Sequence, residues 1–230
     1  MTSPEPVTRL VLVRHGVTAH NLEGRLQGQL DVPLTRQGME QARRTAEVVA
    51  AMDPRVVISS PLSRARATAR AIASASGLGE VGVDPRLAEI DLGRWAGRTP
   101  EELRASAPDY VAAQTRTDDY RRSDGETAGE VAARIAAACQ DAAAGHRGQT
   151  VVLVSHGFAL RSGVAHLLGG DHRSSQVLGG LANCSWTLLD HLGPQETRQR
   201  GLERPWRLRA YNCQVPTGVG GRVASSRSTR

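Results

Sequence analysis

The most informative stretch of the sequence is LVLVRHG at residues 10–16, where four apolar residues run directly into an arginine, a histidine and a glycine. An unbroken apolar run of this kind is typical of a strand that is buried on both faces, as in parallel sheets. A second stretch, VVLVSHG at residues 151–157, has the same form. The sequence therefore predicts two buried parallel strands, which are followed at once by His15 and His156.

Helix signals alternate with these strands along the chain. A third apolar run, residues 56–58, leads into Ser59-Ser60-Pro61, which predicts an N-cap and a first-turn proline for a helix over residues 62–76. Three more helices are expected to begin at threonine caps: from Thr35 to about Met52, from Thr99-Pro100, and from the capping box Thr127-x-x-Glu130 to about Gly145. This alternation predicts an α/β three-layer sandwich, with a mostly parallel central sheet and helices on both faces.

The C-terminal part of the chain differs from the rest. Residues 184–190 and 206–211 are predicted to be two later strands that form a hairpin or lie at a sheet edge. The length of 230 residues favours one catalytic domain, residues 1–215. Residues 216–230 consist mainly of Gly, Ser, Arg and Thr, and we expect them to form a disordered basic tail.

The charge of the chain is carried by arginine alone. All 29 Lys+Arg residues are arginine, which excludes chemistry that needs an amine side chain. Residues 198–230 hold 8 Arg and 1 Glu, a net charge of +7, whereas the other 21 Arg and 22 acidic residues give −1. Because the excess is confined to one end of the chain, we expect a solvated basic segment and no nucleic-acid partner.

Other classes of protein are disfavoured by what the sequence lacks. No apolar run approaches the ~20 residues that span a membrane, and the first six residues do not have the order of a secretory signal. We therefore expect a cytoplasmic protein with no membrane partner. The cysteines, Cys139, Cys184 and Cys213, form no Cys-x-x-Cys pair and are predicted to be buried thiols. No metal or other cofactor is expected, since no metal-ligand motif is present.

The chemistry is predicted at the carboxyl ends of the strands, where open parallel sheets bind ligands. Three segments meet there: Arg14-His15, residues 59–64 with Arg64, and Ser155-His156. A neutral imidazole is a suitable nucleophile toward phosphorus, and arginines can bind the phosphoryl oxygens. These residue types favour phosphoryl transfer through a phosphohistidine. Glu89 is a candidate for the acid that protonates the leaving oxygen, with Asp91 as its competitor.

Several motifs resemble the histidine phosphatase superfamily, in its phosphoglycerate-mutase-like branch. They are residues 13–21, 24–28, 31–38, 59–69, 87–97, 125–127 and 155–157, so the resemblance covers about residues 8–190. It implies that His15 is the phosphorylated nucleophile and Glu89 the acid and base, with Arg14, Arg64 and His156 in the phosphate pocket. It also implies that Asn21 and Gly157 line this pocket and that Gln27 lies near it. The chain departs from the family pattern at Val17, His20 and Ala96, and none of these is a catalytic position.

The resemblance leaves the exact reaction open. The segment after Glu89, Ile90 to Trp95, is similar to the phosphatase form of the family rather than to its mutases, so hydrolysis of a small phosphomonoester is expected. Residues 179–187 and 206–212 resemble actinobacterial glucosyl-3-phosphoglycerate phosphatases. The alternatives are a phosphoglycerate mutase, an α-ribazole-type phosphatase and a protein that binds a phospholigand without turnover. A homodimer is common among relatives, and the segments around Trp186 and Trp206 could form either an interface or part of the core.

Overall fold

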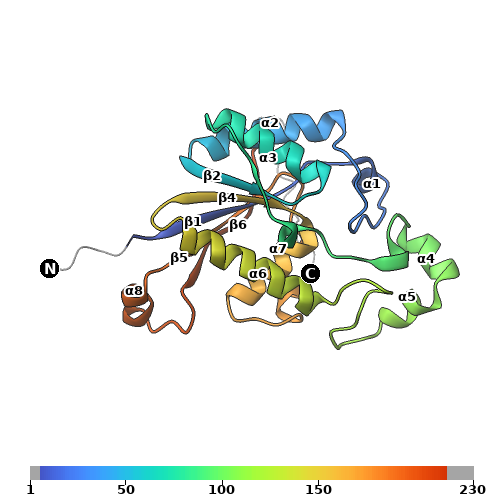
Figure 1. Cartoon of the computed structure of the whole chain (residues 1–230). Helices are drawn as coiled ribbons and strands as arrows, with labels where there is room; N and C mark the ends of the chain where they lie inside the picture. The colour runs from blue at the N-terminus through green and yellow to red at the C-terminus, as the bar shows by residue number, and fades with distance from the viewer. Residues whose placement is uncertain (1–5, 217–230) are drawn as a thin grey trace, which may run out of the picture.

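A six-stranded sheet forms the centre of the computed structural model, which describes residues 6–216 (Figure 1). The strand order is β3 (Gly82–Val83), β2 (Pro54–Ser59), β4 (Thr150–Ser155), β1 (Thr8–Arg14), β5 (Trp186–His191) and β6 (Trp206–Cys213). The first four strands are parallel, whereas β5 is antiparallel to both β1 and β6. The predicted mostly parallel α/β sheet is confirmed. The two late strands, β5 and β6, pair with each other, and β6 forms one edge of the sheet.

The two faces of the sheet are covered by different helices. In β1, Leu10 and Leu12 point to one face, where they pack with α6 (Ala128–Gly145) and α7 (Gly157–Leu167). Val11 and Val13 point to the other face and pack with α2 (Arg36–Ala50) and α3 (Ser63–Ala75). Because neighbouring side chains of a strand alternate between faces, an unbroken apolar run is what a sheet covered on both sides requires. Each fully buried side chain of this kind contributes about 1.5–3 kcal/mol.

Further elements lie beyond the carboxyl ends of the strands, on the right of Figure 1. They are α1 (Ala19–Leu22), α4 (Pro100–Ser106) and α5 (Pro108–Ala113). The 3-10 helices η1 (Pro85–Leu87) and η2 (Gly93–Trp95) lie between β3 and α4 in the chain. Trp95 is the centre of a small separate core: its ring meets that of Tyr110 edge-on at 5.2 Å, and Leu103 is buried beside it. The elements η2, α4 and α5 therefore share a core of their own.

Most predicted helix starts are confirmed, and one is wrong. Thr35, Thr99 and Thr127 cap α2, α4 and α6 with their side chains. The predicted cap at Ser59-Ser60-Pro61 is not formed, because α3 begins at Ser63 with Leu62 as its N-cap, so the proline precedes the helix. The polar stretch between the last two strands contains an unpredicted short helix, α8 (Pro194–Gln199).

The expectations for the C-terminal segment have different outcomes. Trp186 and Trp206 are buried in the two large cores on opposite faces of the sheet, which accounts for both rings, and the homodimer stays a prediction. Residues 217–230, which make up nearly all of the predicted disordered tail, lie outside the described residues. Among residues 6–216, no helix is long and apolar enough to cross a membrane.

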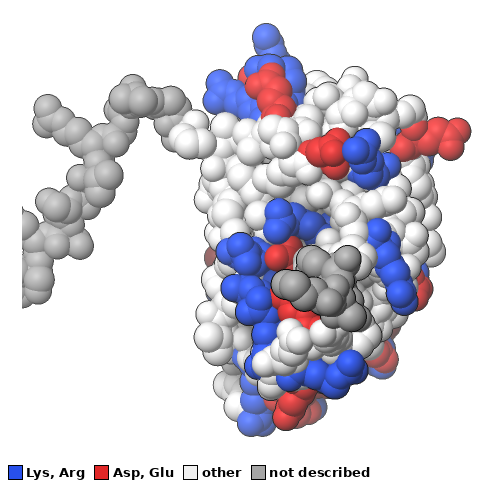
Figure 2. Space-filling model, turned by 90° about the vertical axis from the view of Figure 1, so that its left-hand side faces the viewer, with Lys and Arg blue, Asp and Glu red and all other residues white. Residues whose placement is uncertain are grey.

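Charged side chains of both signs share the face at the far end of the sheet from His15 and His156. Figure 2 shows this face, where arginines lie among acidic residues. Arg200 pairs with Glu196 at 2.7 Å on α8, and Arg9 pairs with Asp190 at 2.9 Å between β1 and β5. Part of the basic charge is therefore compensated locally. That the protein binds no nucleic acid stays a prediction.

Candidate active site

A cavity of about 340 Å³ lies at the carboxyl ends of the parallel strands. Strand register brings its walls together, since Arg14 at the end of β1 pairs with Ser155 at the end of β4, and Ser59 of β2 pairs with Val154. Seven of the eight predicted site residues line it: Arg14, His15, Asn21, Gln27, Arg64, Glu89 and Gly157. The eighth, His156, is fully buried and is not among the lining residues.

His15 is held as a neutral imidazole with one defined free nitrogen. Its Nδ1 lies 2.7 Å from the carbonyl oxygen of Gly16, which can only accept, so Nδ1 carries the proton and Nε2 has the lone pair. The ring is 2% exposed. Burial, followed by the positive charges of Arg64 and Arg14, holds the pKa of His15 well below its ordinary value. The result is an unprotonated nitrogen among cations, which is the form in which a histidine acts as a nucleophile.

The loop after His15 is fixed by backbone contacts that need glycine. A side chain on Gly16 would place its Cβ 2.4 Å from the carbonyl oxygen of Gly38, and one on Gly38 would lie 2.2 Å from that of Val17. The first turn of α2 therefore lies directly against the residues that follow His15. On the other side, the side-chain amide of Asn183 donates to the carbonyl oxygen of His15 at 3.0 Å.

Arg14 has an unused donor in the cavity wall. Its Nη1 donates to the carbonyl oxygen of Leu181, whereas its Nε is buried and has no hydrogen-bond partner in the described structure. A Cβ on Gly157 would lie 3.2 Å from that Nε, so glycine allows the guanidinium to lie against the start of α7. Burial lowers the pKa of Arg14, and the charge of Glu89 acts in the opposite direction. An unpaired buried donor of a cation is a place where an anionic oxygen can bind.

Arg64 and His156 form a second buried unit behind the cavity. Arg64 is 0% exposed, donates through Nη2 to the carbonyl oxygen of Gly28 at 2.7 Å, and donates through Nε to Nδ1 of His156 at 3.2 Å. His156 Nδ1 is therefore an acceptor, and its Nε2–H donates to Ser60 Oγ at 2.8 Å. Burial, His15 and the nearby arginines lower the pKa of His156 well below its ordinary value. Its ring centre lies 5.0 Å from that of His15.

The carboxylate of Glu89 lies at the N-terminus of α7. Oε1 accepts from the N–H groups of Ile90 and Ala159 at 2.9 Å each, and Oε2 accepts from the N–H of Phe158 at 3.2 Å. A helix N-terminus offers unpaired N–H groups and a partial positive charge, and both stabilise a carboxylate. Oε2 accepts a single protein hydrogen bond and so retains capacity for a proton or a water molecule.

Asp91, the predicted competitor of Glu89, is not among the residues that line the cavity. Its Oδ1 accepts from the N–H of Gly93 at 2.9 Å, at the start of η2.

Two polar residues of the N-terminal segment line the cavity beside His15. Asn21 Oδ1 accepts from the N–H of Thr18 at 3.1 Å, and Gln27 Oε1 accepts from the hydroxyl of Thr18 at 2.8 Å. Both oxygens are thus used within the protein, which leaves their amide N–H groups as donors.

Nine further residues of the wall were not predicted as site residues, among them Arg25, Phe158, Arg161 and Leu181. Arg161 could have been found, since it lies four residues after Gly157 and so shares its face of the helix. Its Nε is buried and has no hydrogen-bond partner among the described residues.

His20 is absent from the wall. Within residues 6–216, no three His, Cys, Asp or Glu side chains are grouped so as to hold a metal ion.

Comparison with known proteins agrees with this geometry. Residues 10–204 match the model of the histidine phosphatase superfamily (branch 1). The chain is 37% identical over 217 residues to a glucosyl-3-phosphoglycerate phosphatase of Mycolicibacterium vanbaalenii, covering 91% of this chain and 96% of the relative. It is 38% identical over 184 residues to a probable phosphoglycerate mutase of an Enterobacter species, covering 80% and 85%.

A solved structure has the same fold over nearly its whole length. It is that of a mycobacterial glucosyl-3-phosphoglycerate phosphatase with VO3, with a TM-score of 0.78 and 36% identity, covering 90% of this chain and 99% of that one. The matched region contains both histidine segments, Arg64 and Glu89. The chain therefore belongs to the histidine phosphatase superfamily (branch 1), and it is a phosphatase that transfers phosphoryl groups through a histidine.

Proposed function

We propose that His15 is the nucleophile of a two-step phosphomonoester hydrolysis and that Glu89 is its proton donor and acceptor. The observation that carries this proposal is the state of His15, whose free Nε2 is fixed by the Nδ1 bond to Gly16 and which lines the same cavity as Glu89. Arg14 and Arg64 flank it. Positioned cations of this kind stabilise the charge that spreads over the phosphoryl oxygens in the transition state.

In the first step, the Nε2 lone pair of His15 forms a bond to phosphorus while the bond to the ester oxygen breaks. Protonated Glu89 gives its proton to the leaving oxygen, which departs as an alcohol. In the second step, the Glu89 carboxylate removes a proton from a water molecule, whose oxygen attacks phosphorus. The N–P bond breaks, inorganic phosphate leaves, and the Nε2 lone pair of His15 is restored.

The pocket residues have distinct roles in this scheme. Arg14 offers the unpartnered Nε to a phosphoryl oxygen, and Asn21 and Gln27 offer amide N–H groups. Arg64 is oriented by Gly28 and by His156, so we propose that His156 supports the phosphoryl group together with Arg64. Gly157 leaves the space in which Arg14 and the phosphoryl group meet at the start of α7.

Trapping of the phosphoenzyme tests the assignment. Brief incubation with a ³²P-labelled phosphomonoester, followed by denaturation, is expected to leave acid-labile phosphate on the wild-type protein and none on His15→Ala. His166→Gln is the matched control, since this histidine lies on α7 outside the cavity wall. Label on His15→Ala, or no label on the wild type under conditions of turnover, would contradict the proposed nucleophile. A protein that binds a phospholigand without turnover would give neither label nor inorganic phosphate.

For the substrate, we propose glucosyl-3-phosphoglycerate, the compound named for two of the similar proteins above. A phosphoglycerate carries a carboxylate besides its phosphoryl group, and the cavity wall has a suitable cation in Arg161. Its Nε is buried and unpartnered in the described structure, and its guanidinium lies 5.7 Å from the centre of the Phe158 ring. Arginine binds carboxylates through two parallel hydrogen bonds.

Substrate comparison tests this part of the proposal. The value of kcat/KM is expected to be clearly higher for glucosyl-3-phosphoglycerate than for 3-phosphoglycerate or p-nitrophenyl phosphate. Arg161→Gln is expected to raise KM for both carboxylated esters and to leave KM for p-nitrophenyl phosphate nearly unchanged, because that ester has no carboxylate. Equal turnover of all three esters would contradict the proposed substrate. Formation of 2-phosphoglycerate from 3-phosphoglycerate, in place of inorganic phosphate, would indicate a mutase.

A further inference from the structure

Arg134, in the middle of α6, holds the chain segment that carries Glu89. Its five N–H donors all have acceptors. Nη1 donates to the carbonyl oxygens of Arg86 and Ala88 at 2.7 and 2.6 Å, and Nη2 donates to that of Glu89 at 3.0 Å. Nε and Nη2 each donate to a carboxylate oxygen of Glu126 at 2.8 Å. An arginine has five such donors in a rigid plane, so this side chain is saturated.

Glu126 extends the contact to the other side of Glu89. Its Oε2 also accepts from the N–H of Asp91 at 2.9 Å, and its own N–H donates to the carbonyl oxygen of Asp91 at 2.9 Å. Burial acts to raise the pKa of Glu126, but the hydrogen bonds from Arg134 and Asp91 outweigh it and lower the pKa below its ordinary value. The two side chains are 17% and 22% exposed, so water screens this ion pair weakly.

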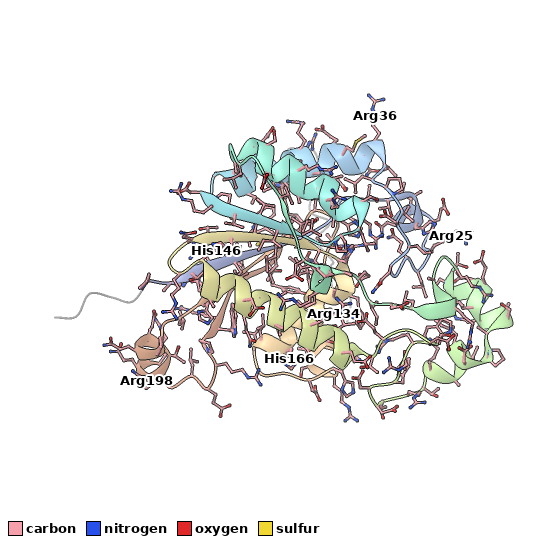
Figure 3. All side chains as sticks on the ribbon, in the orientation of Figure 1. Arg25, Arg36, Arg134, His146, His166 and Arg198 are labelled. Atoms are coloured by element: carbon pink, nitrogen blue, oxygen red, sulfur yellow. The ribbon has the colours of Figure 1, made fainter. Side chains whose placement is uncertain are left out.

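The segment that they hold has little support of its own. Residues 88–92 lie between η1 and η2, outside any strand or helix. The carboxylate of Glu89 accepts from N–H groups at the start of α7, whereas its carbonyl oxygen accepts from Arg134. Besides Arg134, Gln29 donates to the Glu89 carbonyl oxygen at 3.0 Å. The direction of the Glu89 side chain therefore depends on carbonyl groups that are held from α6. Figure 3 shows Arg134 on α6, in the middle of the molecule, and Arg198 at its left-hand end.

We infer that Arg134, together with Glu126, is a positioning residue for Glu89. Arg134 sets the geometry of proton transfer from Glu89 to the leaving group, and it does not contact the substrate itself. This inference rests on the proposed role of Glu89 as the acid. A displacement of about 1 Å in a reacting group can lower a rate by ~10²-fold. Loss of the Arg134 contacts is expected to act on the step that needs the Glu89 proton.

The test uses two esters that differ in their need for a proton. Hydrolysis of 3-phosphoglycerate expels an alkoxide and requires an acid, whereas p-nitrophenolate is a good leaving group that departs without one. The measured quantity is kcat/KM, which reports the steps up to phosphorylation of His15. Arg134→Ala is expected to lower kcat/KM for 3-phosphoglycerate by ~10²-fold. The value for p-nitrophenyl phosphate is expected to change far less.

Two further variants separate positioning from general loss of stability. Arg134→Lys keeps the charge and the aliphatic stem but has three donors and no planar fork, and it is expected to show the same selective loss. Val49→Ala, in α2 on the opposite face of the sheet, removes core packing away from Glu89. It is expected to lower the melting temperature and to change kcat/KM for the two esters by the same factor. Guanidinium ion, added well below denaturing concentrations, is expected to restore 3-phosphoglycerate hydrolysis in Arg134→Ala, and methylammonium ion is not.

Glu89→Gln distinguishes failure of this inference from failure of the proposed mechanism. If Glu89→Gln lowers kcat/KM for both esters equally, another residue is the acid. The proposed function and the inference then fail together. Glu89→Gln can show the selective loss while Arg134→Ala and Arg134→Lys lower kcat/KM for both esters equally, or for neither. In that case the inference alone is overturned. Selective loss in Glu89→Gln and both Arg134 variants, with rescue by guanidinium, supports it.

Discussion

Two histidines are kept neutral in the interior, and both are expected to make stability depend on pH. His15 and His156 have pKa values held well below the ordinary 6.5, chiefly by burial and then by nearby positive charges. In the unfolded chain they would bind protons near pH 6.5. As the pH falls below that value, the unfolded state binds more protons than the folded state, so the free energy of unfolding decreases. The burial that keeps His15 and His156 neutral thus destabilises the protein in acid.

The size of this effect can be predicted. Each of the two histidines is expected to reduce the free energy of unfolding by up to about 1.4 kcal/mol per pH unit below pH 6.5, until its folded-state pKa is reached. Urea unfolding at pH 7, 6 and 5 would measure the slope. His156→Asn is expected to make it shallower, and the double variant with His15→Asn shallower still. An unchanged slope in the double variant would show that these histidines do not cause the acid sensitivity.

Among the helices and strands, α2 makes a close backbone contact with the His15 loop. Thr35 at the N-cap of α2 donates to the carbonyl oxygen of Val17 through its backbone N–H at 3.0 Å and its hydroxyl at 3.2 Å. Gly38 follows one turn later and meets Val17 backbone to backbone. The helix thus restrains the two residues after His15, and any added atom at Gly38 must displace one of them.

Gly38→Ala is therefore expected to be costly. Its Cβ would lie 2.2 Å from the carbonyl oxygen of Val17, and overpacking of this kind costs about 1–3 kcal/mol. Turnover is expected to fall as well, because the loop that holds His15 must move. Gly79→Ala is the matched control, since a Cβ at this exposed position meets nothing within 4 Å. Urea unfolding and kcat/KM for 3-phosphoglycerate would measure both effects. Equal values for the two variants would contradict the steric argument.

Elements with strong local signals could be predicted from the sequence, and elements that depend on distant contacts could not. The apolar runs of β1 and β4 and the threonine caps of α2, α4 and α6 carry their signals within a few residues. The cap expected at Ser59-Ser60-Pro61 does not form: Ser60 Oγ meets His156, 96 residues away, and accepts from the N–H of Leu62, which precedes the helix. Helix α8 was missed because it has six residues and none of them is buried.

For the molecule as a whole, the predicted site residues meet because the parallel topology brings the carboxyl ends of β1, β2 and β4 to one edge. Strand ends are visible in a sequence, so His15, Arg64 and Gly157 could be placed there before the structure was known. The contacts of Arg134 could not be predicted in this way. They join α6 to carbonyl groups 45 to 48 residues earlier in the chain, and carbonyl groups carry no sequence signal.

The domain boundary gives a prediction for the whole chain. All proposed site residues lie between Arg14 and Arg161, and the family match ends at residue 204. Residues 217–230 contain Arg222, Arg227 and Arg230 and no acidic residue, so a chain that ends at Pro216 has a formal charge of +3 in place of +6. At 0.15 M salt the Debye length is about 8 Å, so the interactions of solvent-exposed charges are strongly screened.

We therefore expect the chain that ends at Pro216 to keep its melting temperature and its kcat/KM for 3-phosphoglycerate at that salt concentration. A charge-matched variant of the full chain, with the three C-terminal arginines changed to Gln, separates loss of charge from loss of residues. If truncation lowers activity and the Gln variant does not, the last 14 residues belong to the catalytic domain, and the boundary at residue 215 is wrong. If the truncated chain and the Gln variant both have lower activity, but only at low salt, the charge of the three arginines acts on the substrate from a distance.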